Sequence, residues 1–85
     1  MKLDSRIASL VAVGASVAAN CQPCLQINTA RAFKHGATRE DVADAVEVGR
    51  RVRAGVASKL DAFAASLDLA DGDARQAGAA CGCPS

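Results

Sequence analysis

Alanine restricts what this chain can fold into more than any other residue, because it fills 20 of the 85 positions and each alanine buries little apolar area. The chain is 51% hydrophobic but only 2% aromatic, with two Phe and neither Trp nor Tyr. Alanine favours helix, and few β-branched or aromatic runs indicate strands. We therefore expect an all-α fold.

The length of the chain permits one domain. For 8.6 kDa, surface scaling gives roughly 4,700 Å² folded against about 12,500 Å² extended, so folding alone buries only about 62% of the surface. Such a monomer is marginal, and we expect other subunits to complete the core in a homo-oligomer. We assign a helical domain to residues 1–70 and a flexible, Gly-rich tail to residues 71–85.

The formal net charge of +1 favours neither a nucleic acid nor an anionic membrane as partner. Lys2 and Arg6 precede an apolar stretch at 7–20 that could be mistaken for an export signal. Asp4 in its basic part and the polar interruptions argue against that interpretation, so we expect a cytoplasmic protein. Four cysteines in that compartment indicate redox or metal chemistry rather than structural disulfides.

Helical periodicity predicts a first helix within residues 3–18 and a second one from about residue 21. We expect Asn20 to cap the second helix, Pro23 to lie in its first turn and Gly36 to end it in the left-handed conformation. Thr38 and Asp41 predict the N-terminal cap of a third helix.

In that third helix, acidic residues come first and basic residues last, which complements the helix dipole. We therefore interpret Arg50, Arg51 and Arg53 as a helix end. Two alternatives stay open at Gly55: it breaks the chain before a fourth helix, or the two stretches form one helix.

The motif Cys21-Gln22-Pro23-Cys24 carries the most chemistry. At a helix N-terminus, unpaired amides and the dipole favour the Cys21 thiolate. Cys24 lies one turn further on and can close a disulfide with it, which gives a nucleophile and a resolving thiol. The plain alternative is two small residues in an Ala-rich core.

The predicted tail carries a second pair, Cys81 and Cys83. This pair could exchange electrons with Cys21 and Cys24 as a second dithiol. All four sulfurs could instead hold Zn²⁺ or another soft metal, although the Cys-x-Cys spacing is tighter than usual. The third alternative is that the tail thiols have no function.

The runs 19–25 (ANCQPCL) and 31–42 (RAFKHGATREDV) resemble the carboxymuconolactone decarboxylase and alkylhydroperoxidase D superfamily. The similarity covers about residues 3–67. It implies an all-helical fold, obligate trimers or hexamers, and reduction of peroxides or disulfides through Cys21 and Cys24. True decarboxylases of the superfamily generally lack the cysteine pair, so a decarboxylase-like protein without redox activity is the weaker alternative.

The sequence departs from the redox members at two positions. Those members place a His four residues after the second cysteine and a Glu twelve residues before the first, as a proton relay; here the positions hold Asn28 and Ser9. Asn28 could hydrogen-bond a thiolate but cannot exchange a proton near pH 7. His35 cannot replace the relay within its helix, because it lies about 16 Å along the axis from Cys24.

These observations predict a thiol–disulfide oxidoreductase, peroxidase-like but without the proton relay, that acts through Cys21 and Cys24 with Asn28 as a weaker candidate. The substrate would be a small thiol, disulfide or peroxide, and a redox partner protein could supply electrons. No nucleotide motif or stacking surface supports a bound flavin or nicotinamide, so we expect no cofactor. The alternative is a soft-metal module that uses Cys21, Cys24, Cys81 and Cys83.

Overall fold

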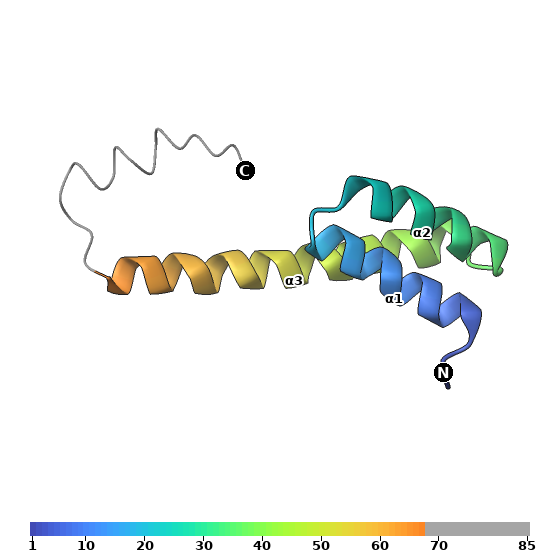
Figure 1. The fold of residues 1–85 in the computed structure, drawn as a ribbon, viewed down its shortest axis with the longest axis horizontal. Helices are drawn as coiled ribbons and strands as arrows, with labels where there is room; N and C mark the ends of the chain where they lie inside the picture. The colour runs from blue at the N-terminus through green and yellow to red at the C-terminus, as the bar shows by residue number, and fades with distance from the viewer. Residues whose placement is uncertain (68–85) are drawn as a thin grey trace.

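A computed structural model describes residues 1–67 as three helices, α1 (Ser5–Ala18), α2 (Gln22–Lys34) and α3 (Arg39–Ser66) (Figure 1). The all-α expectation is confirmed for these residues. None of the helices in this range is long and apolar enough to cross a membrane. The predicted tail at 71–85, with Cys81 and Cys83, lies outside the described residues.

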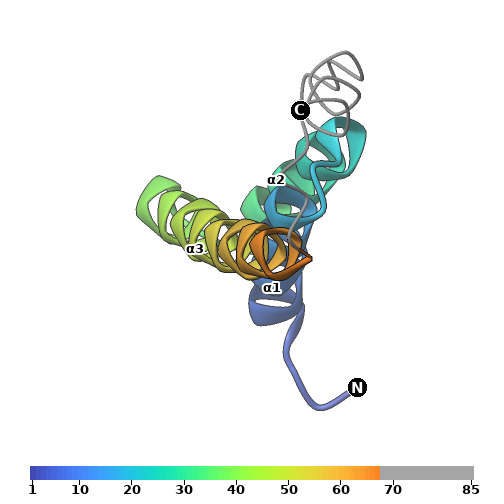
Figure 2. The same ribbon diagram turned by 90° about the vertical axis from the view of Figure 1, so that its left-hand side faces the viewer.

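Helix α1 is the centre of the arrangement, because it packs against both other helices while α2 and α3 barely touch (Figure 2). Its N-cap is Asp4, whose carboxylate accepts a 2.8 Å hydrogen bond from the Ile7 amide. The core that results is small. Its buried members are Val13, Ala32, Ala37 and Val42.

Two glycines let α1 and α3 pack backbone to backbone. A Cβ built on Gly49 would collide with the Gly14 carbonyl oxygen and would lie 2.8 Å from the Val17 Cβ. A Cβ on Gly14 would lie 3.1 Å from the Ala45 carbonyl oxygen. The contact between these helices therefore requires glycine at position 49.

The connection from α2 to α3 follows the predicted cap residues. His35 is the C-cap of α2, and Gly36 has a φ of +91°, in the left-handed region expected for it. Thr38 and Asp41 form a reciprocal capping box: the Thr38 hydroxyl accepts from the Asp41 amide, and the Asp41 carboxylate accepts from the Thr38 amide, each at 3.0 Å. The hydrogen bond from the Thr38 backbone amide is the main cause that lowers the pKa of Asp41, and the positive charge of nearby Arg6 lowers it further.

The interpretation of the basic cluster as a helix end is wrong. Helix α3 runs without a break through Arg50, Arg51 and Arg53 to Ser66, which at 28 residues makes it about 42 Å long. One exposed glycine costs a helix only about 1 kcal/mol, so Gly55 does not interrupt it. Arg51 lies inside the helix and pairs with Glu47 at 3.2 Å.

The C-terminal half of α3 extends beyond the other two helices (Figure 1). Every residue from 50 to 67 is exposed in the single chain. A row of large apolar side chains nevertheless continues along one face of this half. We call it the α3 stripe, and its members are Val48, Val52, Val56, Leu60, Phe63 and Leu67.

The close contact between α1 and α3 predicts that alanine has opposite effects on stability at two glycines of α3. Gly49→Ala should lower the free energy of unfolding by about 1–3 kcal/mol, because the new methyl group forces α1 away from α3. Gly55→Ala is the matched control in the same helix, since a Cβ there meets no atom within 4 Å. This control should raise stability by about 0.5–1 kcal/mol. Urea unfolding followed by circular dichroism measures both, and equal effects would contradict the close approach.

The capping box predicts a pH-dependent effect of Asp41→Asn. Because the native pKa of Asp41 is lowered, its carboxylate stabilises the fold above its unfolded pKa, about 3.9, and this contribution is lost as the pH falls through the native value. The variant should therefore melt at a lower temperature than wild type at pH 7, and the difference should shrink below about pH 4. Asp44→Asn is the control, because exposed Asp44 in the same helix makes no side-chain hydrogen bond to another described residue, and it should not reproduce the loss of melting temperature at pH 7.

Candidate redox site

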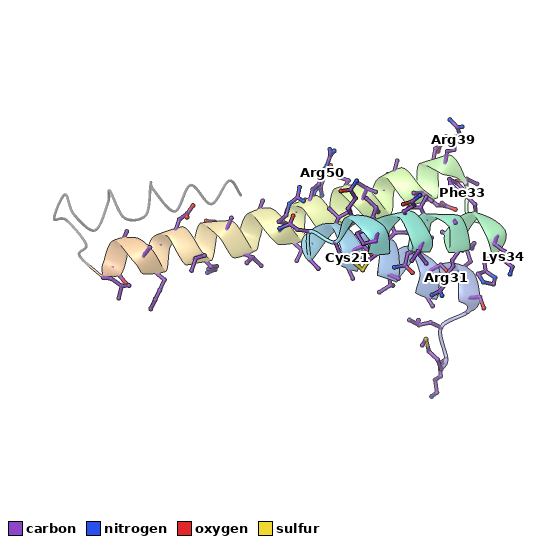
Figure 3. All side chains as sticks on the ribbon, turned by 45° about the horizontal axis from the view of Figure 1, so that its top comes forward. Cys21, Arg31, Phe33, Lys34, Arg39 and Arg50 are labelled. Carbon is purple, nitrogen blue, oxygen red and sulfur yellow. A yellow bond between two sulfur atoms is a disulfide. The ribbon has the colours of Figure 1, made fainter. Side chains whose placement is uncertain are left out.

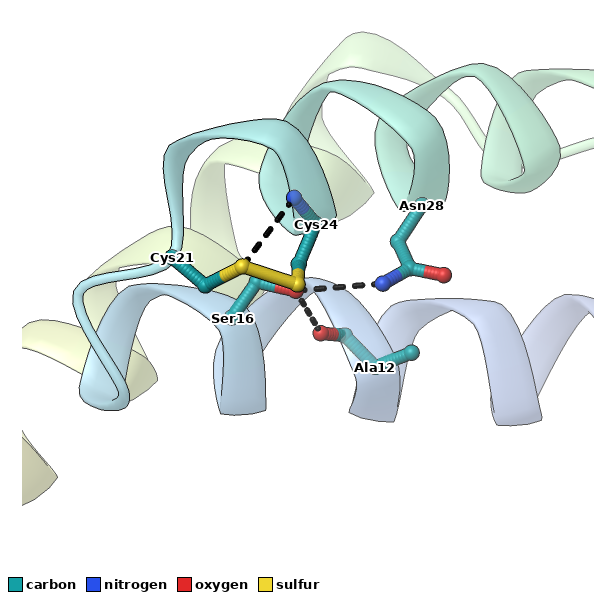
Figure 4. Close-up of a disulfide and its surroundings, with 5 residues drawn as sticks. All are labelled: Ala12, Ser16, Cys21, Cys24 and Asn28. Carbon is teal, nitrogen blue, oxygen red and sulfur yellow. Dashed lines mark hydrogen bonds between the residues drawn. A yellow bond between two sulfur atoms is a disulfide. The ribbon is translucent and has the colours of Figure 1, made fainter.

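The cysteine motif lies at the start of α2, where Cys21 and Cys24 form a disulfide with a Cα–Cα distance of 5.2 Å (Figure 4). Cys21 itself is the N-cap, and its sulfur accepts a 3.3 Å hydrogen bond from the Cys24 amide. Pro23 lies in the first turn, as predicted. Cys24 is exposed and Cys21 half-buried, so a small molecule in solution can reach the disulfide.

The prediction that Asn20 caps α2 is wrong. Asn20 lies one residue before the cap and has a φ of +56°, a left-handed conformation that Asn tolerates better than most residues. Its side-chain oxygen accepts a 2.9 Å hydrogen bond from Arg53, which also donates to the Val17 carbonyl at 3.3 Å. Arg53 thus ties the tight turn before Cys21 to the middle of α3.

Asn28 lies one turn after Cys24 but makes its hydrogen bond elsewhere. Its amide donates to the Ser16 hydroxyl at 3.1 Å, and Ser16 donates to the Ala12 carbonyl at 2.7 Å (Figure 4). Ser16 is buried, so this chain fixes α2 against α1 beside the disulfide. In the disulfide form, Asn28 therefore makes its side-chain hydrogen bond to α1.

The other two residues considered for proton transfer lie away from this network. Ser9 is buried in α1, and its hydroxyl donates to the Ser5 carbonyl at 2.7 Å. His35 is the C-cap of α2, at the opposite end of that helix from the disulfide. The length of α2 therefore separates His35 from Cys24, as the spacing in the sequence predicts.

A hollow of about 320 Å³ opens beside Cys21, between the end of α1, the start of α2 and the middle of α3. In Figure 3, Arg50 and Cys21 lie at the same level along α3. No Asp, Glu, His or Lys is among the described residues that line it. The polar and charged side chains around it are Ser16, Asn20, Gln22, Arg50 and Arg53.

Sequence reasoning missed Ser16, Arg50 and Arg53 as residues of this site. One feature of the sequence could have indicated Ser16. Ser16 interrupts an apolar stretch seven residues after Ser9, on the same side of the helix. Arg50 and Arg53 are not at a helix end, and no pattern along α3 indicates that they line this hollow.

A second hollow, of about 430 Å³, lies between α1 and α3 and is lined almost wholly by apolar side chains. Gly14 and Gly49 form part of its floor, and Val48 and Val52 of the α3 stripe form one wall. None of the described residues that line it carries a group for redox or metal chemistry.

Within residues 1–67, no three His, Cys, Asp or Glu side chains lie close enough together to hold a metal ion. The metal hypothesis therefore gains no further ligand beside Cys21 and Cys24 in this part of the chain. A sulfur in a disulfide is not a thiolate, so Cys21 and Cys24 cannot ligate a metal in this oxidised form. The other two candidate ligands, Cys81 and Cys83, lie outside the described residues.

The profile of the carboxymuconolactone decarboxylase family matches residues 1–68, four-fifths of the chain. The chain belongs to this family. The match begins at the first residue of the chain and ends one residue after the last described residue, and it includes the disulfide and every residue of the hollow. Neither a curated protein nor a solved structure matches this family member significantly.

Proposed function

We propose that this protein is a thiol–disulfide oxidoreductase that cycles between the Cys21–Cys24 disulfide and its dithiol. The observation that carries the proposal is the disulfide at the N-terminus of α2, accessible to solvent and held by a hydrogen bond from the Cys24 amide to the Cys21 sulfur. After reduction, the same amide and the helix dipole favour a thiolate at Cys21, which is the form that attacks disulfides.

Disulfides fit this site better than peroxides as substrates. A thiolate is a good leaving group because thiols ionise near pH 8.5, so exchange needs no proton donor. Cleavage of a peroxide O–O bond expels a much more basic oxygen, which a nearby acid must protonate. Among the described residues around the pair, Ser16, Asn28 and the arginines cannot act as that acid near pH 7.

The reaction transfers two electrons. The Cys21 thiolate attacks one sulfur of the substrate disulfide, whose S–S bond breaks and releases one thiolate. The Cys24 thiolate then attacks the Cys21 sulfur of the mixed disulfide and releases the second thiolate. The protein ends as the Cys21–Cys24 disulfide, and a dithiol or two monothiols reduce it again by the reverse steps.

We further propose that the protein acts as a homo-oligomer, a trimer or hexamer, with the α3 stripe at the interface. Val56, Leu60 and Phe63 are 60–62% exposed in the single chain, although they form one continuous apolar face. The stripe adjoins the apolar hollow between α1 and α3. A second copy of the same helix would cover both, and Val13 is the only large side chain in residues 1–67 that is completely buried without one.

The redox proposal predicts that the pair equilibrates with thiols in the physiological range. In a chain with Cys81→Ser and Cys83→Ser, titration in thiol–disulfide buffers read by mass spectrometry should give a reduction potential between about −300 and −180 mV. A much lower potential would identify the pair as a structural bridge. Cys21→Ser should abolish reduction of added disulfides, whereas Cys24→Ser should accumulate a mixed disulfide at Cys21.

The association proposal predicts that a charge on the stripe disrupts the oligomer. Leu60→Glu should shift the sedimentation coefficient to that of a smaller species, because the carboxylate would be buried between apolar surfaces. Ser58→Glu is the control, since Ser58 is exposed two residues earlier, on the other side of α3. Dissociation by both substitutions, or by neither, would contradict the assignment of the interface.

A further inference from the structure

The three arginines in the middle of α3 differ in what they contact. The Arg51 side chain pairs with Glu47, and the Arg53 side chain binds the turn at Val17 and Asn20. Arg50 has no ion pair or hydrogen bond from its side chain to any other described residue, although it lines the hollow beside Cys21. Arg50 therefore belongs to the lining of the hollow and has no side-chain partner among the described residues.

The hollow has the charge and size for a small anion that carries sulfur. Its described lining contains two guanidinium groups and no carboxylate, and Arg53 is already used in the turn. Its volume of about 320 Å³ lies at the lower end of the range for small-molecule sites. Cys21 belongs to the same lining, so the hollow joins a reactive cysteine and two arginines.

We propose that this hollow binds a small thiol or disulfide that carries a carboxylate, with Arg50 as the residue that holds the carboxylate. The inference rests on the proposed redox function and deepens it by naming the substrate class. The planar guanidinium can donate two parallel hydrogen bonds to one carboxylate. Because both groups line one small hollow, a substrate held at Arg50 brings its sulfur to Cys21.

The exchange keeps this contact through both steps. The Cys21 thiolate attacks the near sulfur of the bound disulfide, the S–S bond breaks, and the far half leaves as a thiolate. The near half stays as a mixed disulfide with its carboxylate on Arg50. The Cys24 thiolate then attacks the Cys21 sulfur and releases this half as a thiolate, so that two electrons have passed from protein to substrate.

The test compares three disulfides of similar size that differ in charge: those of mercaptopropionate, mercaptoethanol and cysteamine. The rate constant for oxidation of the reduced protein is measured by stopped flow in the full chain with Cys81→Ser and Cys83→Ser. Arg50→Gln should slow the anionic disulfide about five- to tenfold and change the neutral one little, as expected for one charged hydrogen-bonded pair near solvent. Arg50→Lys should restore part of the loss.

Arg51→Gln is the matched control, because it removes the same charge from the neighbouring residue, which pairs with Glu47. It should leave all three rate constants unchanged. An equal loss for the three disulfides in Arg50→Gln would mean that Arg50 acts on the Cys21 thiolate rather than on the substrate. An equal effect of Arg51→Gln would mean that only the overall charge matters. Either result would overturn the inference.

A binding measurement separates this inference from the proposed function. The disulfide form is titrated with S-methyl mercaptopropionate, which has the carboxylate but cannot exchange, and the Arg50 and Cys21 resonances are followed by NMR. Shifts that disappear in Arg50→Gln support the carboxylate site even if the protein reduces no disulfide, in which case the redox function alone fails. Reduction of all three disulfides at equal rates, without such shifts, would overturn the carboxylate site alone.

Discussion

The backbone contact between α1 and α3 is the constraint on which the rest of the structure depends. Because Gly49 leaves no side chain between the helices, α1 lies directly against the middle of α3. Arg53, one turn after Gly49, then reaches the last turn of α1 at Val17 and the Asn20 side chain. The residues that lead into Cys21 are thereby held by a helix that is distant in sequence.

The chemistry of the site follows from how the end of α1 and the start of α2 are placed near the middle of α3. The turn after α1 must be tight, and Asn20 in its left-handed conformation allows α2 to begin at the next residues. Cys21 then becomes the N-cap, where an amide hydrogen bond reaches its sulfur. Arg50 and Arg53 line the hollow beside Cys21 because α1 packs against the middle of α3.

Small residues also explain why the core of the described residues is small. Alanine and glycine let helices approach closely, but they provide little apolar area, and the core of the single chain is confined to a few residues around Val13. The large apolar side chains stand instead on the projecting half of α3. The close packing around the Cys21–Cys24 disulfide and the small core that leaves the α3 stripe exposed are thus two results of one composition.

The sequence by itself determined the local features: helices throughout, the cysteine pair at a helix start, the glycine turn at Gly36 and the capping box at Thr38. Each depends on residues within one or two turns of each other, so spacing and side-chain type suffice to predict it. Only the tertiary structure decided that Asn20 binds Arg53, that Asn28 binds Ser16 and that Arg50 lines a hollow with Cys21. The Asn28 contact joins α2 to α1, and the arginine contacts bring α3 to residues near the start of α2. No pattern along one helix specifies which of its faces meets another helix.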